Sequence, residues 1–245
     1  MRVLLRLAYD GTDFRGWQFQ PGLPTVQGTL EDAIEKLCRR KCPVHGAGRT
    51  DSGVHAAGMP AHADLSREEL ERVNEGLNGL LPRSMALLSV KEVRDDFHAR
   101  FDAVSRTYTY SVGRKRDPFR RRFEYQPKLS SLDTRAMAKA AEHSLGTGSW
   151  KGFAKEGSGN ASWIMSVSRA VVEESYSGWT FTITADRFLR GVVRIWSGTL
   201  LRIGSGAIPP ETVSSIISGE DRSLAGQSLP ACGLVLKDVE YASGE

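Results

Sequence analysis

The sequence predicts an α+β fold in which helices pack on sheets, and three observations support this. Strand patterns and amphipathic helix patterns alternate in both halves of the chain. Hydrophobic residues make up 40% of the chain and charged residues 25%, which is an ordinary globular composition. The length of 245 residues suits either one large domain or two of about 120 residues each, with no need of disulfides or metal to hold a core.

Two helices are expected in the first half. Thr25 is placed to cap the first, and Ser66 with Glu69 forms the capping-box pattern of the second. Their apolar residues recur at helical spacing: Val26, Leu30, Ala33, Ile34 and Leu37, then Leu70, Val73, Leu77 and Leu80. The expected strands are residues 3–9 and 86–93. The glycine-rich, polar residues 46–58 are expected to be loop.

Two helices and four strands are expected in the second half. Met137, Ala141 and Leu145 predict a helix that Gly146 ends. A second helix is indicated by Leu189, Val192, Val193, Trp196, Leu200 and Ile203. The expected strands are Thr107–Val112, a hairpin of residues 167–174 and 179–185 around Ser177-Gly178, and residues 233–241. We divide the chain into an N-terminal domain of residues 1–100 and a C-terminal domain of residues 101–245.

Charge and cysteine usage narrow the class of protein. The formal charge of +4 and the pI of about 9.0 favour a polyanionic partner. Cys38, Cys42 and Cys232 are an odd number without framework spacing, which indicates reduced thiols. The N-terminus lacks the pattern of a signal peptide, and no apolar run is long enough to span a membrane. We therefore expect a cytoplasmic protein.

The segment from Gly46 to Ala56, GAGRTDSGVHA, combines three glycines with a carboxylate, an arginine and two hydroxyls. Composition alone favours a plain polar turn. A phosphate-binding loop is the other option, but the lysine and the spacing of a P-loop are absent.

The segment resembles the Gly-Arg-Thr-Asp-x-Gly-Val-His signature of the tRNA pseudouridine synthase A (TruA) family. Further motifs follow in the family's order and span positions 9 to 241: Tyr9-Asp10-Gly11-Thr12, Gly16-Trp17-Gln18, Thr25-Val26-Gln27-Gly28, Phe97-His98-Ala99-Arg100, Arg106-x-Tyr108-x-Tyr110, Phe188-Leu189-x-x-Val192-Val193-Arg194, Gly198-Thr199-Leu200 and Gly233-Leu234. Three departures stand out: Ser52 replaces an alanine, Ile195 replaces an asparagine, and residues 158–166 match poorly.

The resemblance implies a role for each matching residue. Asp51 is the catalytic carboxylate, and Arg49 occupies the space that the target base leaves when it is flipped out. Arg194 keeps Asp51 ionised. Tyr108 stacks on the flipped uracil, and Leu234 supplies an apolar wall. Taken without the resemblance, Arg194 is an ordinary helix arginine and Tyr108 an ordinary strand aromatic.

The resemblance also implies a fold, a substrate and a partner. Two ferredoxin-like or RRM-like subdomains, with mostly antiparallel sheets, join into one extended sheet with helices on one side and the active-site cleft between them. The substrate is the tRNA anticodon stem-loop, with targets at positions 38, 39 and/or 40, and the enzyme is a homodimer. Pseudouridine formation is redox-neutral and uses no activated donor, so no cofactor or metal is expected.

The segment from Arg114 to Phe123 predicts contact with RNA independently of the signature. It holds two aromatic residues and six cations: Arg114, Lys115, Arg116, Arg120, Arg121 and Arg122. Lysine and arginine contact phosphates, and arginine and aromatic rings stack on bases. The plainer explanation is a solvated surface loop.

Three other functions are weighed. A zinc site would draw on Cys38, Cys42, His45, His55 and His62, but Cys38 lies on an apolar-periodic helix and only one cysteine pair exists. An ATP-dependent enzyme would use Asp10-Gly11-Thr12, but no second phosphate loop follows. A non-catalytic protein that binds structured RNA is the remaining alternative, although Arg49, Asp51, Tyr108 and Arg194 are all present.

Overall fold

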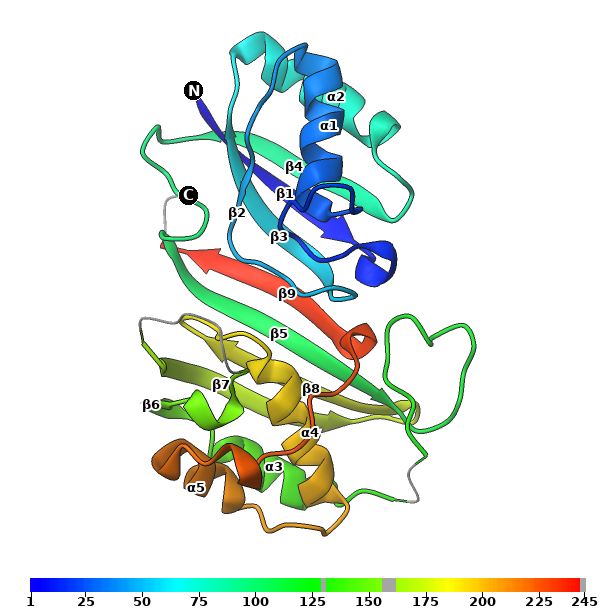
Figure 1. Cartoon of the computed structure of the whole chain (residues 1–245), viewed down its shortest axis with the longest axis vertical. Coiled ribbons are helices and arrows are strands. Elements are labelled where there is room, and N and C mark those ends of the chain that lie inside the picture. Colours follow the sequence, from blue (N-terminus) through cyan, green and yellow to red (C-terminus); the bar gives the residue numbers. More distant parts are fainter. Residues whose placement is uncertain (129–130, 156–161, 243–245) are drawn as a thin grey trace. The chain divides into compact units, whose positions relative to one another are not determined.

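A computed structural model describes residues 1–128, 131–155 and 162–242, and it divides the chain into two compact units. Unit 1 comprises Met1–Val104 together with the C-terminal residues from Val235, and unit 2 comprises Ser105–Leu234. The chain leaves unit 1 near the start of strand β5 (Ala103–Gly113) and returns to it at the start of strand β9 (Leu234–Tyr241), as Figure 1 shows. The domain boundary expected at residue 100 lies four residues before the exit from unit 1.

Unit 1 is a sheet with two helices. Its strands are β1 (Arg2–Tyr9), β2 (His45–Gly46), β3 (His55–Asp64), β4 (Met85–Val93) and β9. Strand β1 pairs antiparallel with both β3 and β4, β2 pairs antiparallel with β3, and β3 pairs parallel with β9. Helices α1 (Val26–Cys38) and α2 (Arg67–Leu80) pack against each other (Figure 1). Leu5, Leu7, Leu30, Ile34 and Leu77 are fully buried in this core.

The expected helix caps of unit 1 are confirmed. The Thr25 hydroxyl accepts a hydrogen bond from the Gly28 amide at 3.3 Å. Ser66 Oγ accepts from the Glu69 amide at 3.2 Å, and Glu69 Oε2 accepts from the Ser66 amide at 2.7 Å, which completes the capping box. Each cap satisfies amide groups that the first turn of a helix leaves without a partner.

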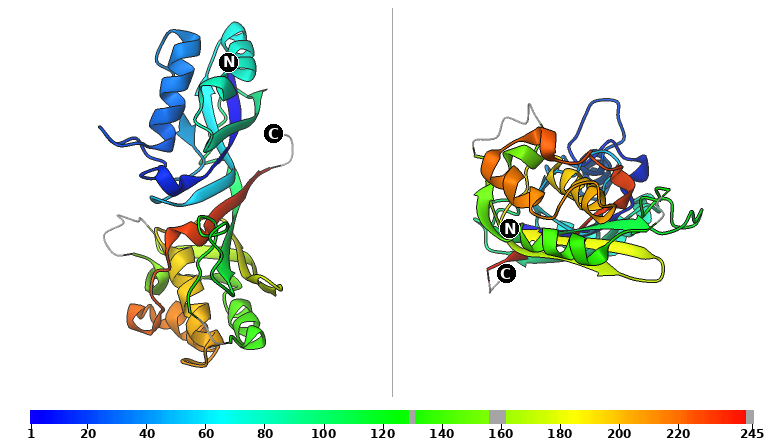
Figure 2. Two further views of the ribbon diagram at one scale, coloured as in Figure 1. Left: turned by 90° about the vertical axis from the view of Figure 1, so that its right-hand side faces the viewer. Right: turned by 90° about the horizontal axis from the view of Figure 1, so that it is seen from below.

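Unit 2 has an antiparallel sheet in the order β5-β8-β7-β6. The strands after β5 are β6 (Gly146–Ser149), β7 (Ile164–Glu174) and β8 (Gly178–Ala185), and the helices are α3 (Thr134–Glu142), α4 (Val192–Gly204) and α5 (Thr212–Gly219). Helix α4 is buried on almost every side, with α3 and α5 also packed in this unit (Figures 1 and 2).

Each unit therefore combines helices with a mostly antiparallel sheet, which confirms the α+β class. No helix among the described residues has the length and apolar character needed to cross a membrane.

Several expected elements differ from the structure. Residues 46–58 are only partly loop, because β2 ends at Gly46 and β3 begins at His55. Helix α3 ends at Glu142, so Leu145 lies outside it and is 51% exposed. Leu189 precedes α4, and strand β6 and helix α5 were not expected. Of the poorly matching segment 158–166, residues 158–161 lie outside the described residues and β7 begins at Ile164.

Three histidine rings lie together in unit 1. His62 on β3 is buried, and its Nδ1 accepts a hydrogen bond from the Ala99 amide at 3.1 Å. Its ring centroid lies 5.0 Å from that of His45 and 4.6 Å from that of His98. Burial is the main cause that lowers the pKa of His62 to about 4, with the charges of His98, Arg2 and His45 acting in the same direction and Asp64 against them. Burial also lowers the pKa of His98.

We expect this cluster to make the free energy of unfolding depend on pH. His62 binds a proton less readily in the folded protein than in the unfolded chain. Its contribution to the free energy of unfolding is therefore complete above its unfolded pKa of 6.5 and is lost as the pH falls towards 4. We expect the free energy of unfolding to fall by about 2 kcal/mol between pH 7.5 and pH 5 because of this group. Urea titrations of wild type and His62→Asn at both pH values measure this fall. The asparagine oxygen can still accept the hydrogen bond from the Ala99 amide, but the side chain does not titrate. Equal pH dependence in both proteins would contradict the expectation.

Candidate active site

Asp51 begins a tight turn in the loop between β2 and β3. The Val54 amide donates to the Asp51 carbonyl at 3.1 Å, and Gly53, at the third position, has φ of 78°. A turn with positive φ at that position is a type II turn, which favours glycine there. The Asp51 side chain is half-buried, and the neighbouring Arg49 is exposed. The turn thus places a carboxylate at the surface of unit 1 on a defined backbone.

The loop is held on both sides of Asp51. The Trp17 amide donates to the Thr50 carbonyl at 3.0 Å, and the Tyr9 hydroxyl bonds the Thr50 hydroxyl at 2.8 Å in a buried position. Gly11 lies so close to the other end that a Cβ there would be 2.0 Å from the Val54 carbonyl oxygen. These contacts bring the Tyr9-Asp10-Gly11-Thr12 motif against the signature loop, and they restrict the motion of Asp51.

Ser52 replaces the alanine that is usual in the family signature, and it adds one bond. Its Oγ donates to the Phe14 carbonyl oxygen at 3.2 Å, and the Gly53 amide donates to the same oxygen at 3.3 Å. Ser52 therefore adds a contact between the turn and the segment that contains Phe14.

Arg194 lies in the first turn of α4, in unit 2. Its Nε donates to the Leu229 carbonyl oxygen at 2.6 Å, and the Leu229 amide donates to the Arg194 carbonyl oxygen at 3.2 Å. Burial raises the pKa of both Tyr110 and Cys232, and in each case the Arg194 charge opposes the rise. The guanidinium is therefore fixed by a backbone bond and lies near the buried Tyr110 phenol and the half-buried Cys232 thiol, just before β9 begins.

Tyr108 lies on β5 opposite Ile183 of β8. The ring is half-buried and meets Phe188 edge to face, with centroids 5.0 Å apart and an interplanar angle of 79°. Leu234 is the buried first residue of β9. Tyr110 is fully buried, and its hydroxyl donates to the Pro230 carbonyl oxygen at 2.7 Å, which ties β5 to the segment before β9.

The expected site residues therefore fall into two groups. Asp51 and Arg49 belong to unit 1, whereas Tyr108, Arg194 and Leu234 belong to unit 2. Within unit 2, both Arg194 and Leu234 lie near Tyr110. The Arg194 charge acts on the Tyr110 hydroxyl, and Leu234 directly follows Gly233, whose backbone adjoins the Tyr110 ring.

Comparison with known proteins decides the family. The tRNA pseudouridine synthase family matches residues 7–102 and 140–242. The chain belongs to the tRNA pseudouridine synthase family. A tRNA pseudouridine synthase A of Bacteroides thetaiotaomicron is 41% identical over 245 residues, which cover 98% of this chain and 90% of the relative. One of Porphyromonas gingivalis is 40% identical, covering 99% and 98%, and one of Maridesulfovibrio salexigens is 38% identical, covering 98% and 90%.

Family membership makes this chain an isomerase that converts uridine in tRNA to pseudouridine. Sequence reasoning did not identify two supports of the site in this synthase. The first is the buried bond between Tyr9 and Thr50, and the second is the packing of Phe188 on Tyr108. All four residues lie inside family motifs, which is the signal by which they could have been found. Their contacts join distant parts of the chain, so the sequence alone did not reveal them.

The basic loop of this synthase, residues 114–123, is held by ion pairs to Glu174 of β7 and to Glu124. Arg114 pairs with Glu174, and its guanidinium lies 4.3 Å from the Trp179 ring centroid. Arg120 lies 3.1 Å from the buried carboxylate of Glu124. Those two cations therefore help to hold the loop. Within the part of the chain that the structure describes, Lys115, Arg116 and Arg121 are exposed and have no ion pair.

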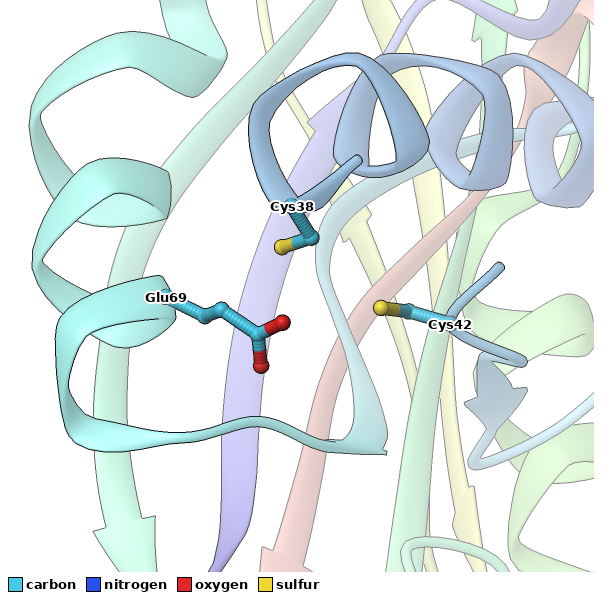
Figure 3. A group of neighbouring side chains, drawn as sticks. All are labelled: Cys38, Cys42 and Glu69. Carbon is cyan, nitrogen blue, oxygen red and sulfur yellow. The ribbon is translucent and has the colours of Figure 1, made fainter. Parts of the chain in front are cut away.

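Cys38, Cys42 and Glu69 form a buried cluster between α1 and α2, shown in Figure 3. One donor atom from each lies within 4.8 Å of the others. Glu69 already accepts from Arg40 at both oxygens, at 2.7 and 2.6 Å, and this bonding lowers its pKa to about 2. Burial raises the pKa of Cys38 to about 12 and raises that of Cys42.

The chemistry of this cluster fits a structural role better than a metal site. Burial raises the pKa of both thiols, which disfavours the thiolate form that a metal binds. The charge of the carboxylate is balanced by Arg40. The histidines of the zinc alternative lie elsewhere: His62 packs between His45 and His98, and His55 Nδ1 accepts from the Gly11 amide at 3.0 Å.

Proposed function

We propose that this synthase isomerises uridine at positions 38, 39 and/or 40 of the tRNA anticodon stem-loop, with Asp51 as the catalytic nucleophile or base. The observation that carries the proposal is the fixed turn at Asp51. A half-buried carboxylate stands at its start, inside the family signature, with Thr50 before it bonded to Tyr9 and Gly53 after it bonded to Phe14. Such a carboxylate is what the reaction requires, because the bond between C1′ and uracil N1 is broken and one between C1′ and uracil C5 is formed, while C5 loses a proton and N1 gains one.

Arg194 is proposed to keep Asp51 ionised. The Nε–Leu229 bond fixes the plane of the guanidinium, so its other nitrogens have a defined direction. A guanidinium ~4 Å from a carboxylate attracts it by about 4 kcal/mol at an effective dielectric constant near 20. An attraction of this size offsets the cost of holding a charged group in a cleft from which a bound tRNA excludes water.

The remaining residues are proposed to hold the displaced base. Arg49, exposed beside Asp51, fills the space in the stem-loop that the flipped uridine leaves. The half-buried Tyr108 ring, supported by Phe188, stacks on the uracil, and Leu234 closes the apolar side. Base–aromatic stacking contributes ~1–3 kcal/mol, which is comparable with the few kcal/mol that base flipping costs.

The finer architecture is also a proposal. We take each unit to be a ferredoxin-like or RRM-like subdomain, with the two sheets joined and the site in the cleft between them. The enzyme is proposed to act as a homodimer in the cytoplasm, with each tRNA bound across both subunits. The proposed subdomain fold, homodimer and location are supported by the family to which the chain belongs.

Mapping pseudouridine in an unmodified tRNA transcript tests the proposed target. We expect new pseudouridine only at those of positions 38, 39 and 40 that carry uridine, and none in a matched transcript with cytidine there. Pseudouridine elsewhere in the tRNA would contradict the position assignment. Tight tRNA binding without any product would favour the alternative, a non-catalytic protein that binds structured RNA.

The basic loop is proposed to contact tRNA phosphates through Arg114, Lys115, Arg116, Arg120, Arg121 and Arg122. Because Arg114 and Arg120 also hold the loop, Lys115, Arg116 and Arg121 are the cleaner residues to change. We expect the variant with all three changed to glutamine to bind tRNA more weakly. The slope of log K against log salt should become shallower by about 2–3. An unchanged slope in a folded variant would exclude these side chains from the RNA contact.

A further inference from the structure

Phe119 is the second most exposed large apolar side chain among the described residues, at 94%. It lies in the loop between β5 and α3, which projects from unit 2 in Figure 1. A phenylalanine offers 150–250 Å² of surface, and burying it in a partner is favourable. Among the described residues no aromatic or cation–π contact involves this ring, so its surface is open to a partner.

The backbone around Phe119 is fixed rather than loose. The Arg120 amide donates to the Asp117 carbonyl oxygen at 3.2 Å, which closes a turn with Asp117 first, Pro118 second and Phe119 third. Aspartate and proline at these positions favour a type I turn. The Phe119 amide donates to Asp117 Oδ1 at 2.9 Å, and Gln126 bonds both the amide and the carbonyl of Asp117 at 2.9 Å.

The two ends of the loop are also joined. The Gly113 amide donates to the Tyr125 carbonyl oxygen at 2.8 Å, and the Tyr125 amide donates to the Ser111 carbonyl oxygen at 3.0 Å. A compact loop with joined ends and an internal hydrogen-bond network presents its tip at little further entropic cost. Phe119 is therefore held out in solvent before any partner arrives.

The charges around the ring indicate the partner. Lys115, Arg116, Arg120 and Arg121 lie within four residues of Phe119, and all are exposed. A second copy of this loop would bring like charges together, whereas a polyanion would be attracted. An exposed aromatic ring among cations matches the recognition of unpaired nucleotides, in which a base stacks on the ring and flanking phosphates meet the cations.

We propose that Phe119 stacks on an unpaired nucleobase of the tRNA while Arg116 and Arg121 contact the flanking phosphates. This rests on the proposed function, because it takes tRNA as the substrate. The contact adds to the affinity for tRNA without entering the chemical step, since the loop holds none of the residues assigned to the reaction.

Binding of tRNA by Phe119→Ala and Phe119→Trp tests the proposal. We expect the alanine variant to bind tRNA roughly 10- to 100-fold more weakly, and the tryptophan variant to bind as well as wild type. Because no charge is removed, the salt slope should not change. Affinity for a blunt RNA duplex, which offers no unpaired base, should be the same for all three proteins. The rate at saturating tRNA should also be retained.

Tyr176 provides a matched control. It is 95% exposed at the tip of the β7–β8 hairpin, but it follows Glu173 and Glu174 rather than cations. Tyr176→Ala should leave tRNA affinity unchanged. Equal binding by wild type and Phe119→Ala would overturn the proposal while leaving the proposed function intact, and failure of wild type itself to bind tRNA would refute both. A change of oligomeric state in Phe119→Ala, measured by sedimentation, would overturn it in favour of a contact between copies of the chain.

Discussion

Asp51→Asn is expected to lower the rate of pseudouridine formation by roughly 10⁴-fold or more, the scale seen when a catalytic nucleophile or base is removed. Asparagine keeps the size of the side chain but cannot carry the negative charge that attack or proton removal requires. Single-turnover assays with enzyme in excess over tRNA measure the chemical step directly, without the influence of product release.

The fold and the tRNA affinity of this variant should survive. The bonds through the Asp51 carbonyl, the Thr50 hydroxyl and the Trp17 and Gly53 amides do not use the side chain at position 51, so they are kept in the variant. We expect a dissociation constant for tRNA within a few-fold of wild type. Ser52→Ala, which removes only the bond to the Phe14 carbonyl, is the matched control and should stay active. Normal activity in Asp51→Asn would refute the role of the carboxylate.

Arg194→Met is expected to lower kcat by about 10³-fold, because a charge pair of about 4 kcal/mol corresponds to three powers of ten in rate. The variant loses both the charge and the Nε bond to the Leu229 carbonyl oxygen. Its effect should appear in kcat more than in KM, since the proposed partner of the guanidinium is Asp51 rather than the tRNA backbone.

Arg194→Lys separates the two contributions. Lysine restores the positive charge but has no Nε–H to direct the side chain, so we expect it to recover only part of the lost rate. Thermal unfolding of both variants controls for damage to unit 2, where the Leu229 bond holds α4 to the segment before β9. A loss confined to KM, with kcat unchanged, would assign Arg194 to tRNA binding instead.

Much of the fold follows from local patterns. The capping residues Thr25 and Ser66 and the alternation along β5 placed those elements correctly, because caps and side-chain periodicity are local properties. Strand β3 was missed because Gly58 and Pro60 disfavour the interior of a strand. In the structure the Pro60 carbonyl oxygen accepts from the Ala47 amide, so the proline still takes part in holding the loop beside Asp51.

Contacts between distant segments could not be predicted. The pattern of residues 233–241 indicates a strand, but not that β9 returns to pair with β3 of unit 1. Family resemblance supplied Asp51, Arg194 and Tyr108, whose roles stay predictions. The ordering of the basic loop by Glu124 and Glu174 depends on side-chain geometry, which spacing along the sequence does not contain.

A crystal structure of Asp51→Asn bound to tRNA is the most direct test of the proposed catalytic centre. We expect that structure to show a uridine of positions 38 to 40 turned out of the stem-loop, with its uracil against the Tyr108 ring. The side chain at position 51 should lie beside the uracil and its sugar, with the Arg194 guanidinium within about 4 Å. A tRNA bound with that uridine still stacked, or with residue 51 facing away from both the base and Arg194, would contradict the account.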